Sequence, residues 1–464
     1  MASETASLFP MSIVGSLSRG TAYIGNTLSR YTLGPGVAVA KPVIQALFSA
    51  IQIGTLLVVD ETAGQCDEYG AAEQPRSTAP HAKLVVKSAA FWWRLFLRGD
   101  MGFAESYMLG EVECADLTQF FHLFIRNRDR LGNGTTWSSM VISAVAGLAR
   151  TTNTMSNALL NTSAHYDISN DMFAAFLSPD MTYSCPIWAP ARGNKVAEML
   201  QDAQMTKLQR FIDGARIKAT DHVLEIGTGW GSFAIEAVRQ TGCRVTTLTL
   251  SREQKALAEQ RIAAAGCAGQ IDVRLQDYRA VEVPAAPYDK IVSIEMLEAV
   301  GREYLGTYFA CIDRLLKKDG GIAMFQCITM PEGRHKAYSR TKDFINHYIF
   351  PGGYLPSTTQ LLNHIAAESR GTLVVEKVEN IGAHYARALA LWRTSFLKNF
   401  DAQIRPALRA EHPDMTDEAV AVFRRKWEYY FAYCEAGFLT KTLGDVIITV
   451  GREGALELME GIPL

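Results

Sequence analysis

A glycine-rich loop carries the first sign of chemistry in this sequence. Residues 223–231 read Val-Leu-Glu-Ile-Gly-Thr-Gly-Trp-Gly, so a short apolar stretch runs directly into Gly227, Gly229 and Gly231. Glycine lets a backbone come close to a ligand and adopt conformations that other residues avoid. The pattern predicts a cofactor loop between a strand and a helix, with a purely structural turn as the alternative.

The acidic residues near this loop indicate which cofactor it binds. A dinucleotide site has a third glycine at its own spacing and an acid about 20 residues further on. Here the acid, Glu225, lies inside the motif, and the next expected strand, 244–250, ends without a carboxylate. The pattern therefore favours S-adenosylmethionine, which has no pyrophosphate to bind, over NAD.

Apolar strands and amphipathic helices alternate through the rest of the chain. Such alternation predicts an α/β fold, in which a parallel sheet carries helices on both faces. Helices are expected at 196–211, 232–240, 252–265, 302–316 and within 384–440, and strands at 244–250, 271–275, 289–294, 321–328 and 445–450.

Ligands of such sheets bind beyond the carboxyl ends of the strands. This rule places polar residues from distant parts of the chain around one crevice. They are the loop 227–231, Thr249, Asp277, Glu298 and Gln326.

Composition limits the class of protein. With 464 residues, 48% hydrophobic and 20% charged, the chain is long enough for two or three globular domains. A net charge of −2 gives no general attraction to nucleic acid. The eight cysteines lack metal-ligand spacing, and we interpret them as reduced thiols of a cytoplasmic protein that has no metal site. They are Cys66, Cys114, Cys185, Cys243, Cys267, Cys311, Cys327 and Cys434.

The amino-terminal segment, residues 1–45, has an unusual charge pattern. From Thr5 to Val59 there is no aspartate or glutamate, whereas Arg19, Arg30 and Lys41 occur. No apolar run reaches the ~18 residues that a membrane span needs. An organelle-targeting peptide, a membrane-surface arm and a disordered tail remain three alternatives.

Residues 46–130 are predicted to form a separate accessory domain. Strands are expected at 55–59 and 83–87, with a loop over 65–80 between them. Apolar residues at helical spacing, 117–124, give one buried helix face. No titratable cluster stands out, so packing or docking is the expected role. Residues 131–160 are predicted to be a linker before a domain at 161–464.

Several separated motifs, taken together in this order, are specific. They are His165-Tyr166-Asp167, Met181–Cys185, Leu248–Gln254, Ser293–Gly301, Tyr348–Ser357 and Asn380–Tyr385. Through them the chain resembles the cyclopropane-fatty-acid synthase family over about residues 161 to 452. The first module matches less well, most clearly at Gly102–Glu111.

This resemblance implies a class I S-adenosylmethionine-dependent methyltransferase domain, which is Rossmann-like, with a smaller N-terminal α+β domain. It also implies transfer of a methylene to the double bond of an unsaturated acyl chain of a phospholipid. The enzyme would then act peripherally at a membrane, as a monomer or a homodimer. A related C- or N-methyltransferase and a catalytically inactive lipid-binding relative are the alternatives.

Two positions depart from the bacterial pattern of this family. Bacterial members carry histidine where this chain has Ala299 and Gln326. Plant members resemble the chain at both positions and also at 427–431 and 443–445. The resemblance is therefore closest to the eukaryotic branch, and the departure bears on the exact product rather than on the reaction class.

The resemblance also implies which residues do the chemistry. A bicarbonate would act as the base, held by Cys185, Glu298, Gln326, the backbone of Ile328 and Tyr430. Glu298 would orient donors around this anion or share a proton with it, and Gln326 would donate through its amide. As alternatives, Cys185 is a small buried hydrophobe, Gln326 a polar strand end and Tyr430 a core aromatic.

For S-adenosylmethionine, the family motifs match residue by residue at eight positions. Tyr183 and Ser184 would close over the methionine end, Gly227 and Gly229 would allow close approach, Thr249 and Gln254 would contact the ribose, and Asp277 and Tyr278 would flank the adenine. The turn 350–353 and the apolar segment 384–400 would line an acyl tunnel, although core packing explains both almost as well.

Overall fold

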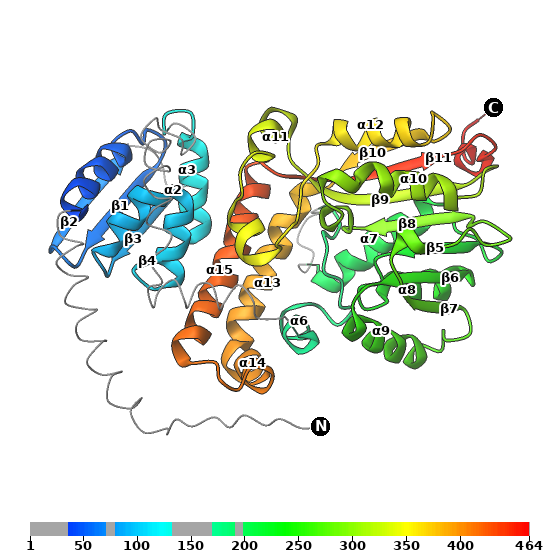
Figure 1. Cartoon of the computed structure of the whole chain (residues 1–464), viewed down its shortest axis with the longest axis horizontal. Helices are drawn as coiled ribbons and strands as arrows, with labels where there is room; N and C mark the ends of the chain where they lie inside the picture. The colour runs from blue at the N-terminus through cyan, green and yellow to red at the C-terminus, as the bar shows by residue number, and fades with distance from the viewer. Residues whose placement is uncertain (1–35, 71–78, 132–168, 191–197, 464) are drawn as a thin grey trace, which may run out of the picture. The chain divides into compact units, whose positions relative to one another are not determined.

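The computed structural model describes residues 36–70, 79–131, 169–190 and 198–463. These divide into two compact units, one up to Ala115 together with 126–131, and one formed by 116–125 and the residues from 169 onward. Figure 1 labels their elements. The predicted linker, the His165-Tyr166-Asp167 motif and residues 1–35 of the amino-terminal segment lie outside the described ranges.

The first unit is a small α+β unit. A helix over 36–48 and helix α2 (Ala90–Met108) accompany a four-stranded sheet. The sheet order is β2 (Gln65–Gly70), β1 (Thr55–Asp60), β3 (His81–Val86) and β4 (Val112–Cys114), with β1 parallel to β3 and the other pairs antiparallel.

Two expectations for this unit need correction. Residues 65–70 form the edge strand β2, not a loop, because a polar and largely exposed edge strand carries no apolar pattern. A titratable cluster is also present: Glu105 is fully buried and pairs with Arg94 and Arg98 of the same kinked helix. Sequence spacing hides this cluster because α2 changes direction at Gly99, where φ is 56°.

The helix over 36–48 belongs to the folded unit, although part of it falls in the segment 1–45 that was expected to be flexible or to serve in targeting. Ala40, Ile44 and Phe48 are buried, and Lys41 pairs with Asp60 at 2.6 Å. Only residues 1–35 therefore stay open to the three alternatives.

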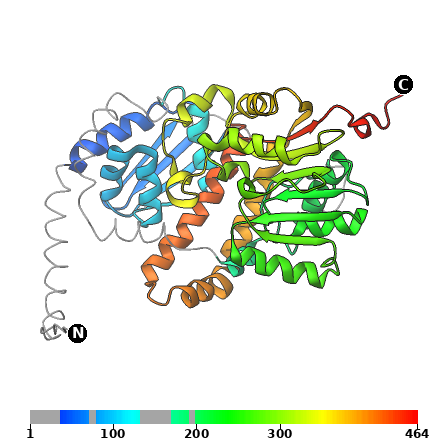
Figure 2. The same ribbon diagram turned by 45° about the vertical axis from the view of Figure 1, so that its right-hand side comes forward.

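The second unit contains a seven-stranded sheet with helices on both faces (Figures 1 and 2). Its order is β10 (Val374–Asn380), β11 (Gly444–Gly451), β9 (Ile322–Thr329), β8 (Lys290–Ile294), β5 (His222–Ile226), β6 (Arg244–Thr249) and β7 (Ile271–Leu275). The five strands from β9 to β7 are parallel, as predicted, but β11 and β10 add antiparallel pairs. β11 is buried along its whole length, so its composition carries no sign of its direction.

Helices cover the two faces of this sheet separately. On one face, α10 (Leu305–Leu315) and α12 (Thr358–Glu368) share a core with Leu224 and Ile226 of β5. The intervening side chains of β5, Val223 and Glu225, point to the other face. The remaining helices of the α/β layer are α7 (Leu200–Gly214), α8 (Ser232–Thr241) and α9 (Arg252–Ala264).

The carboxyl-terminal helical stretch packs as an aromatic layer. It consists of α13 (Tyr385–Asn399), α14 (Arg405–Glu411) and α15 (Asp417–Leu439). Trp392 and Phe396 of α13 lie in the same aromatic cluster as Trp427 of α15. On the other side of α15, Phe121 of α3 (Leu117–Asn127) contacts Tyr429, which confirms the predicted apolar face of that helix.

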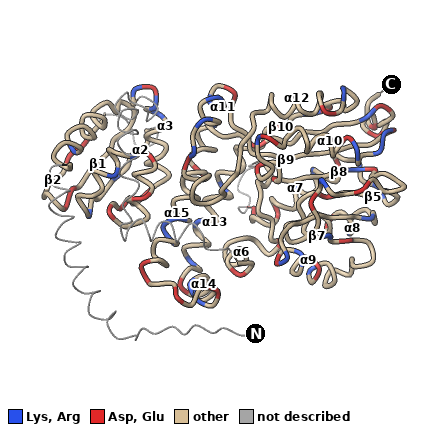
Figure 3. The backbone as a smooth tube through the Cα atoms, in the orientation of Figure 1, with Lys and Arg blue, Asp and Glu red and all other residues tan. Residues whose placement is uncertain are grey.

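Charge and hydropathy add two observations. Lysine and arginine alternate with aspartate and glutamate along both units (Figure 3). None of the helices in the described ranges is both long and apolar enough to cross a membrane.

Candidate active site

The chain order of the sheet creates a crevice at one place. Within this sheet the chain passes first through β5, continues outward through β6 and β7, and then returns to form β8 on the other side of β5. Neighbouring loops at such a switch point leave in opposite directions, and ligands bind between them. A cavity of about 1090 Å³ lies there, lined by the loops after β5, β6 and β8. A single small ligand needs roughly 300–1,000 Å³, so the cavity has room for a cofactor and part of a second molecule.

The glycine loop forms the turn between β5 and α8. Gly227, Gly229 and Gly231 have φ values of 105°, 51° and 84°, which side chains rarely tolerate. A Cβ atom on Gly229 would meet no protein atom within 4 Å, so the backbone here faces open cavity. The loop is held against β6, because the N–H groups of Gly227 and Thr228 both donate to the carbonyl of Leu248.

The other predicted cofactor residues also line this cavity. They are Tyr183, Ser184, Thr249, Gln254, Asp277 and Tyr278. The Thr249 hydroxyl donates to Gln254 Oε1 at 2.9 Å, which leaves the Gln254 amide to donate elsewhere. Asp277 is held by Arg279 at 2.6 Å. An open glycine turn followed by polar groups on successive strand ends fits a nucleoside that has no pyrophosphate.

Two acidic side chains stand at the end of β8, in the same cavity wall. Glu298 Oε1 accepts the N–H of Ile328, and no N–H or O–H donor in the described ranges reaches Oε2. Burial and the neighbouring Glu295 raise the pKa of Glu298 to about 8. At neutral pH this group is therefore mostly a neutral acid that can donate a proton.

Glu295 has a different environment. It accepts the Cys185 N–H at 2.6 Å, the Gln326 amide at 2.7 Å and the Tyr385 hydroxyl at 2.8 Å. Burial raises its pKa, while hydrogen bonds with Asp445, the Cys185 N–H and Tyr385, together with nearby Lys207, oppose the rise. Asp445, at the start of β11, accepts the Gln326 amide at 3.1 Å, and its pKa lies well above the usual range because of burial and Glu295.

Not every predicted catalytic residue reaches the cavity. Glu298, Ile328 and Tyr430 line it, and the Tyr430 hydroxyl lies 2.7 Å from that of Tyr183. Cys185 and Gln326 are fully buried behind Glu295, outside the lining. The Gln326 amide donates to Glu295 and Asp445, and the Cys185 N–H donates to Glu295. Cys185 and Gln326 therefore contact the cavity wall through Glu295.

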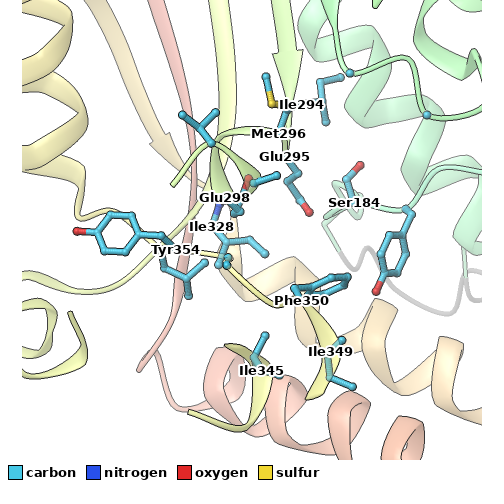
Figure 4. A pocket seen from close by; sticks show the side chains of 18 of the residues that line it. Ser184, Ile294, Glu295, Met296, Glu298, Ile328, Ile345, Ile349, Phe350 and Tyr354 are labelled. Carbon is cyan, nitrogen blue, oxygen red and sulfur yellow. Dashed lines mark hydrogen bonds between the residues drawn. The ribbon is translucent and has the colours of Figure 1, made fainter. Parts of the chain in front are cut away.

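The apolar half of the cavity lies opposite Glu295 and Glu298. Figure 4 shows Glu295 and Glu298 on one side, and Ile345, Ile349 and Phe350 on the other. The predicted turn 350–353 lines this half. Of the segment 384–400, which was also predicted to line an acyl tunnel, only Tyr385 lines the cavity. Leu389, Trp392 and Phe396 are buried in the core instead.

Sequence reasoning missed Glu295, Lys207, Tyr385 and Asp445. Glu295 was within reach, since it lies three residues before Glu298 in the same motif, and its φ of 47° sets it apart from the strand. Asp445 and Lys207 come from β11 and α7, and only the tertiary structure brings them here. Glu225, inside the glycine motif, accepts the Thr247 hydroxyl at 2.6 Å, and burial raises its pKa to about 8.

Metal ligands are not a feature of the described part of the chain, which holds no group of three or more histidine, cysteine or acidic side chains suited to a metal ion. The eight cysteines, all within the described ranges, are unbridged.

Comparison with known proteins gives a consistent result. Residues 153–447 match the family described as mycolic acid cyclopropane synthetase. The chain is 38% identical to the tuberculostearic acid methyltransferase UfaA1 of Mycobacterium tuberculosis, over 78% of this chain and 81% of that protein. It is 34% identical to the cyclopropane-fatty-acyl-phospholipid synthase of Escherichia coli K12, over 81% and 90% of the two chains.

A solved structure of a protein named as a cyclopropane synthase also resembles this chain. The mycolic acid cyclopropane synthase CmaA1, complexed with S-adenosylhomocysteine (SAH) and CTAB, superposes with a TM-score of 0.53 at 28% identity. The superposition covers 63% of this chain and 98% of that one.

Proposed function

Because the chain belongs to the mycolic acid cyclopropane synthetase family and is an S-adenosylmethionine-dependent methyltransferase, we propose that it transfers a methylene to the double bond of an unsaturated acyl chain of a phospholipid. The product would be a cyclopropane fatty acyl chain. The observation that supports the proposal is one cavity in which the glycine loop with the predicted cofactor residues, a pair of glutamates and an apolar half adjoin.

The cofactor supplies an electrophilic methyl group. An alkene is a weak nucleophile, so its attack leaves a carbocation on the acyl chain, and ring closure then requires loss of a proton from the new methyl. The protein must orient the chain, exclude water and stabilise positive charge. Ile345, Ile349 and Phe350 would hold the acyl chain, while ionised Glu295 would favour the cation.

We further propose a bicarbonate as the base. Glu298 Oε2 is buried and lacks an N–H or O–H donor in the described structure, so it fits an O–H group of a bound ion. Glu298 and Tyr430 would hold this ion from the cavity wall, whereas Ile328 would hold it only if its N–H left Glu298. Cys185 and Gln326 would support it through Glu295.

A specific observation favours a second candidate. The 38% identical relative is named a tuberculostearic acid methyltransferase, so the second candidate is methyl addition to the acyl chain without ring closure, in which the carbocation loses a proton from the chain instead of from the new methyl. In either case we propose that the enzyme works at a membrane surface, where its phospholipid acceptor resides.

Labelled cofactor separates these outcomes. With S-adenosylmethionine carrying a fully deuterated methyl and dioleoyl-phosphatidylglycerol vesicles, ring closure should give a product that keeps two of three deuterons and shows upfield cyclopropane signals in the proton NMR spectrum. Vinyl signals with two deuterons would indicate an exocyclic methylene instead. Retention of all three deuterons would reject the synthase proposal, and distearoyl lipid is the unreactive control.

A further inference from the structure

A lysine is buried beside the carboxylates. Lys207 of α7 is fully buried, and its Nζ donates to Ser184 Oγ at 2.6 Å. Burial lowers the pKa of Lys207, because a charged ammonium is costly away from water unless other charges compensate it. The structure must therefore provide those charges.

Acidic groups from several elements face this ammonium. Those that raise the pKa of Lys207 are Glu295 after β8, Cys185 and Asp180 in the segment before α7, and Asp445 of β11, and Lys207 in turn lowers the pKa of Glu225 on β5. In the described ranges, three lysine or arginine residues line the cavity: Lys207, Arg279 and Arg334. Arg279 and Arg334 are exposed, whereas Lys207 is buried. Lys207 is thus the buried positive charge of the cavity wall.

Among the acids, Glu295 is the one arranged to be an anion. It accepts three hydrogen bonds, from Cys185, Gln326 and Tyr385, and such donors favour a carboxylate. The hydrogen bond between Glu295 and Asp445 raises the pKa of Asp445 and lowers that of Glu295, which favours the charge on Glu295. Glu298 is also mostly protonated at neutral pH, and among the neighbouring acids Glu295 favours the charged form of Lys207 most.

We propose that Lys207 is a positioning residue of the methyl transfer: its ammonium keeps Glu295 ionised and holds the Ser184 hydroxyl at the cofactor end of the cavity. Ionised Glu295 in turn fixes Gln326 and Tyr385 and keeps the proton on Glu298. Removal of Lys207 should therefore disturb both glutamates, although in the described structure the Lys207 ammonium donates to Ser184 and to neither glutamate.

The test compares Lys207→Met, which keeps the length and removes the charge, with Lys207→Arg and with the surface control Lys218→Met. For Lys207→Met we expect turnover at least ~10-fold lower, with the acid limb of the pH profile moved to higher pH and the alkaline limb to lower pH. Lys207→Arg should leave both limbs near their wild-type positions. Equal profiles for Lys207→Met and Lys218→Met would overturn the proposal.

A double variant tests the route through Glu295. If Lys207 acts through it, the Lys207→Met effect should be much smaller in a Glu295→Gln background, and equal effects in both backgrounds would contradict the proposal. Should Lys207→Met alone fail to fold, recovery of folding in the double variant supports the charge pairing, and no recovery contradicts it.

A second readout needs no lipid, so it separates this proposal from the proposed function on which its activity assay rests. Without Lys207, Glu295 must ionise without a counter-charge, so its pKa, already raised by burial, rises further, and the native state keeps a proton that the unfolded chain has released. The melting temperature of Lys207→Met should therefore fall further below that of wild type as pH rises from about 6 to 9. A constant difference would overturn the inference, whereas absence of lipid product from wild type would overturn only the proposed function.

Discussion

At the scale of single residues, two glutamates three positions apart differ because their partners differ. Glu295 receives three donors and faces Lys207, whereas Glu298 receives one backbone N–H and the negative field of Glu295. Environments that push the pKa values of two acids apart are the usual way for one site to hold both a charge and a proton. On this basis we propose that Glu298 is the acid that shares a proton.

Replacement of Glu298 by glutamine tests this assignment. Gln keeps the shape but cannot exchange a proton, so turnover should fall by at least ~100-fold while SAH affinity, measured by calorimetry, changes little. Wild-type turnover should decline as pH rises through about 8, where Glu298 ionises. Glu303→Gln, an exposed neighbour outside the cavity lining, is the control, and near-normal turnover of Glu298→Gln would return Glu298 to a structural role.

The same substitution has a stability readout. Between its ordinary pKa of 4.5 and about 8, Glu298 keeps a proton in the native state that the unfolded chain has released. Wild-type stability therefore falls over this range, and Glu298→Gln removes that loss. The melting temperature of the variant relative to wild type should rise from pH 5 to 8.

At the scale of elements, the turn from β5 to α8 decides how close a ligand comes to the sheet. Its three glycines with positive φ let the chain reverse while leaving the space above Gly229 open. Gly231 then serves as the N-cap of α8. At Gly229 the backbone therefore borders the predicted cofactor half of the cavity with no side chain between them.

Gly229→Val should abolish SAH binding in calorimetry, because a branched side chain would fill this open space. The substitution also forces valine into a left-handed conformation at a cost of roughly 1–2 kcal/mol. Gly266→Val is a matched control, since Gly266 also has a positive φ of 74° and nothing within 4 Å, but lies outside the cavity lining. If both variants bind SAH as wild type does, the loop is not the cofactor site.

At the scale of the whole molecule, the cavity belongs entirely to the second unit. None of the described residues before Asp116 lines it. The first unit has its own sheet and its own buried ion pairs, and we propose that it contributes something other than the chemistry. We propose that the domain boundaries follow this division.

Deletion of residues 1–35 should leave SAH affinity and melting temperature unchanged and should weaken association with anionic vesicles in a sedimentation assay. Positive charge without acids, as at Arg19 and Arg30, favours anionic lipid. A longer deletion, 1–48, is the contrast: it removes buried Ala40, Ile44 and Phe48 and should lower the melting temperature. Unchanged vesicle binding after deletion of 1–35 would reject the membrane-arm alternative.

The sequence by itself determined the strand-loop-helix of the cofactor, the parallel part of the sheet and the place of Glu298, because each depends on local signals. Glycine spacing marks the turn, and apolar periodicity marks strands and helices over short windows. Polar residues that follow parallel strands must then meet at one edge. The family motifs added Tyr183, Ser184 and Tyr430, all of which line the cavity.

Only the tertiary structure decided which charges meet. Lys207, Glu295 and Asp445 come from α7, the end of β8 and β11, and no spacing in the sequence relates them. The antiparallel insertion of β11 next to β9 brings Asp445 opposite Ile328 and beside Gln326. The same placement turned Gln326 and Cys185 toward Glu295 rather than the cavity, because a buried carboxylate needs donors and these were within reach.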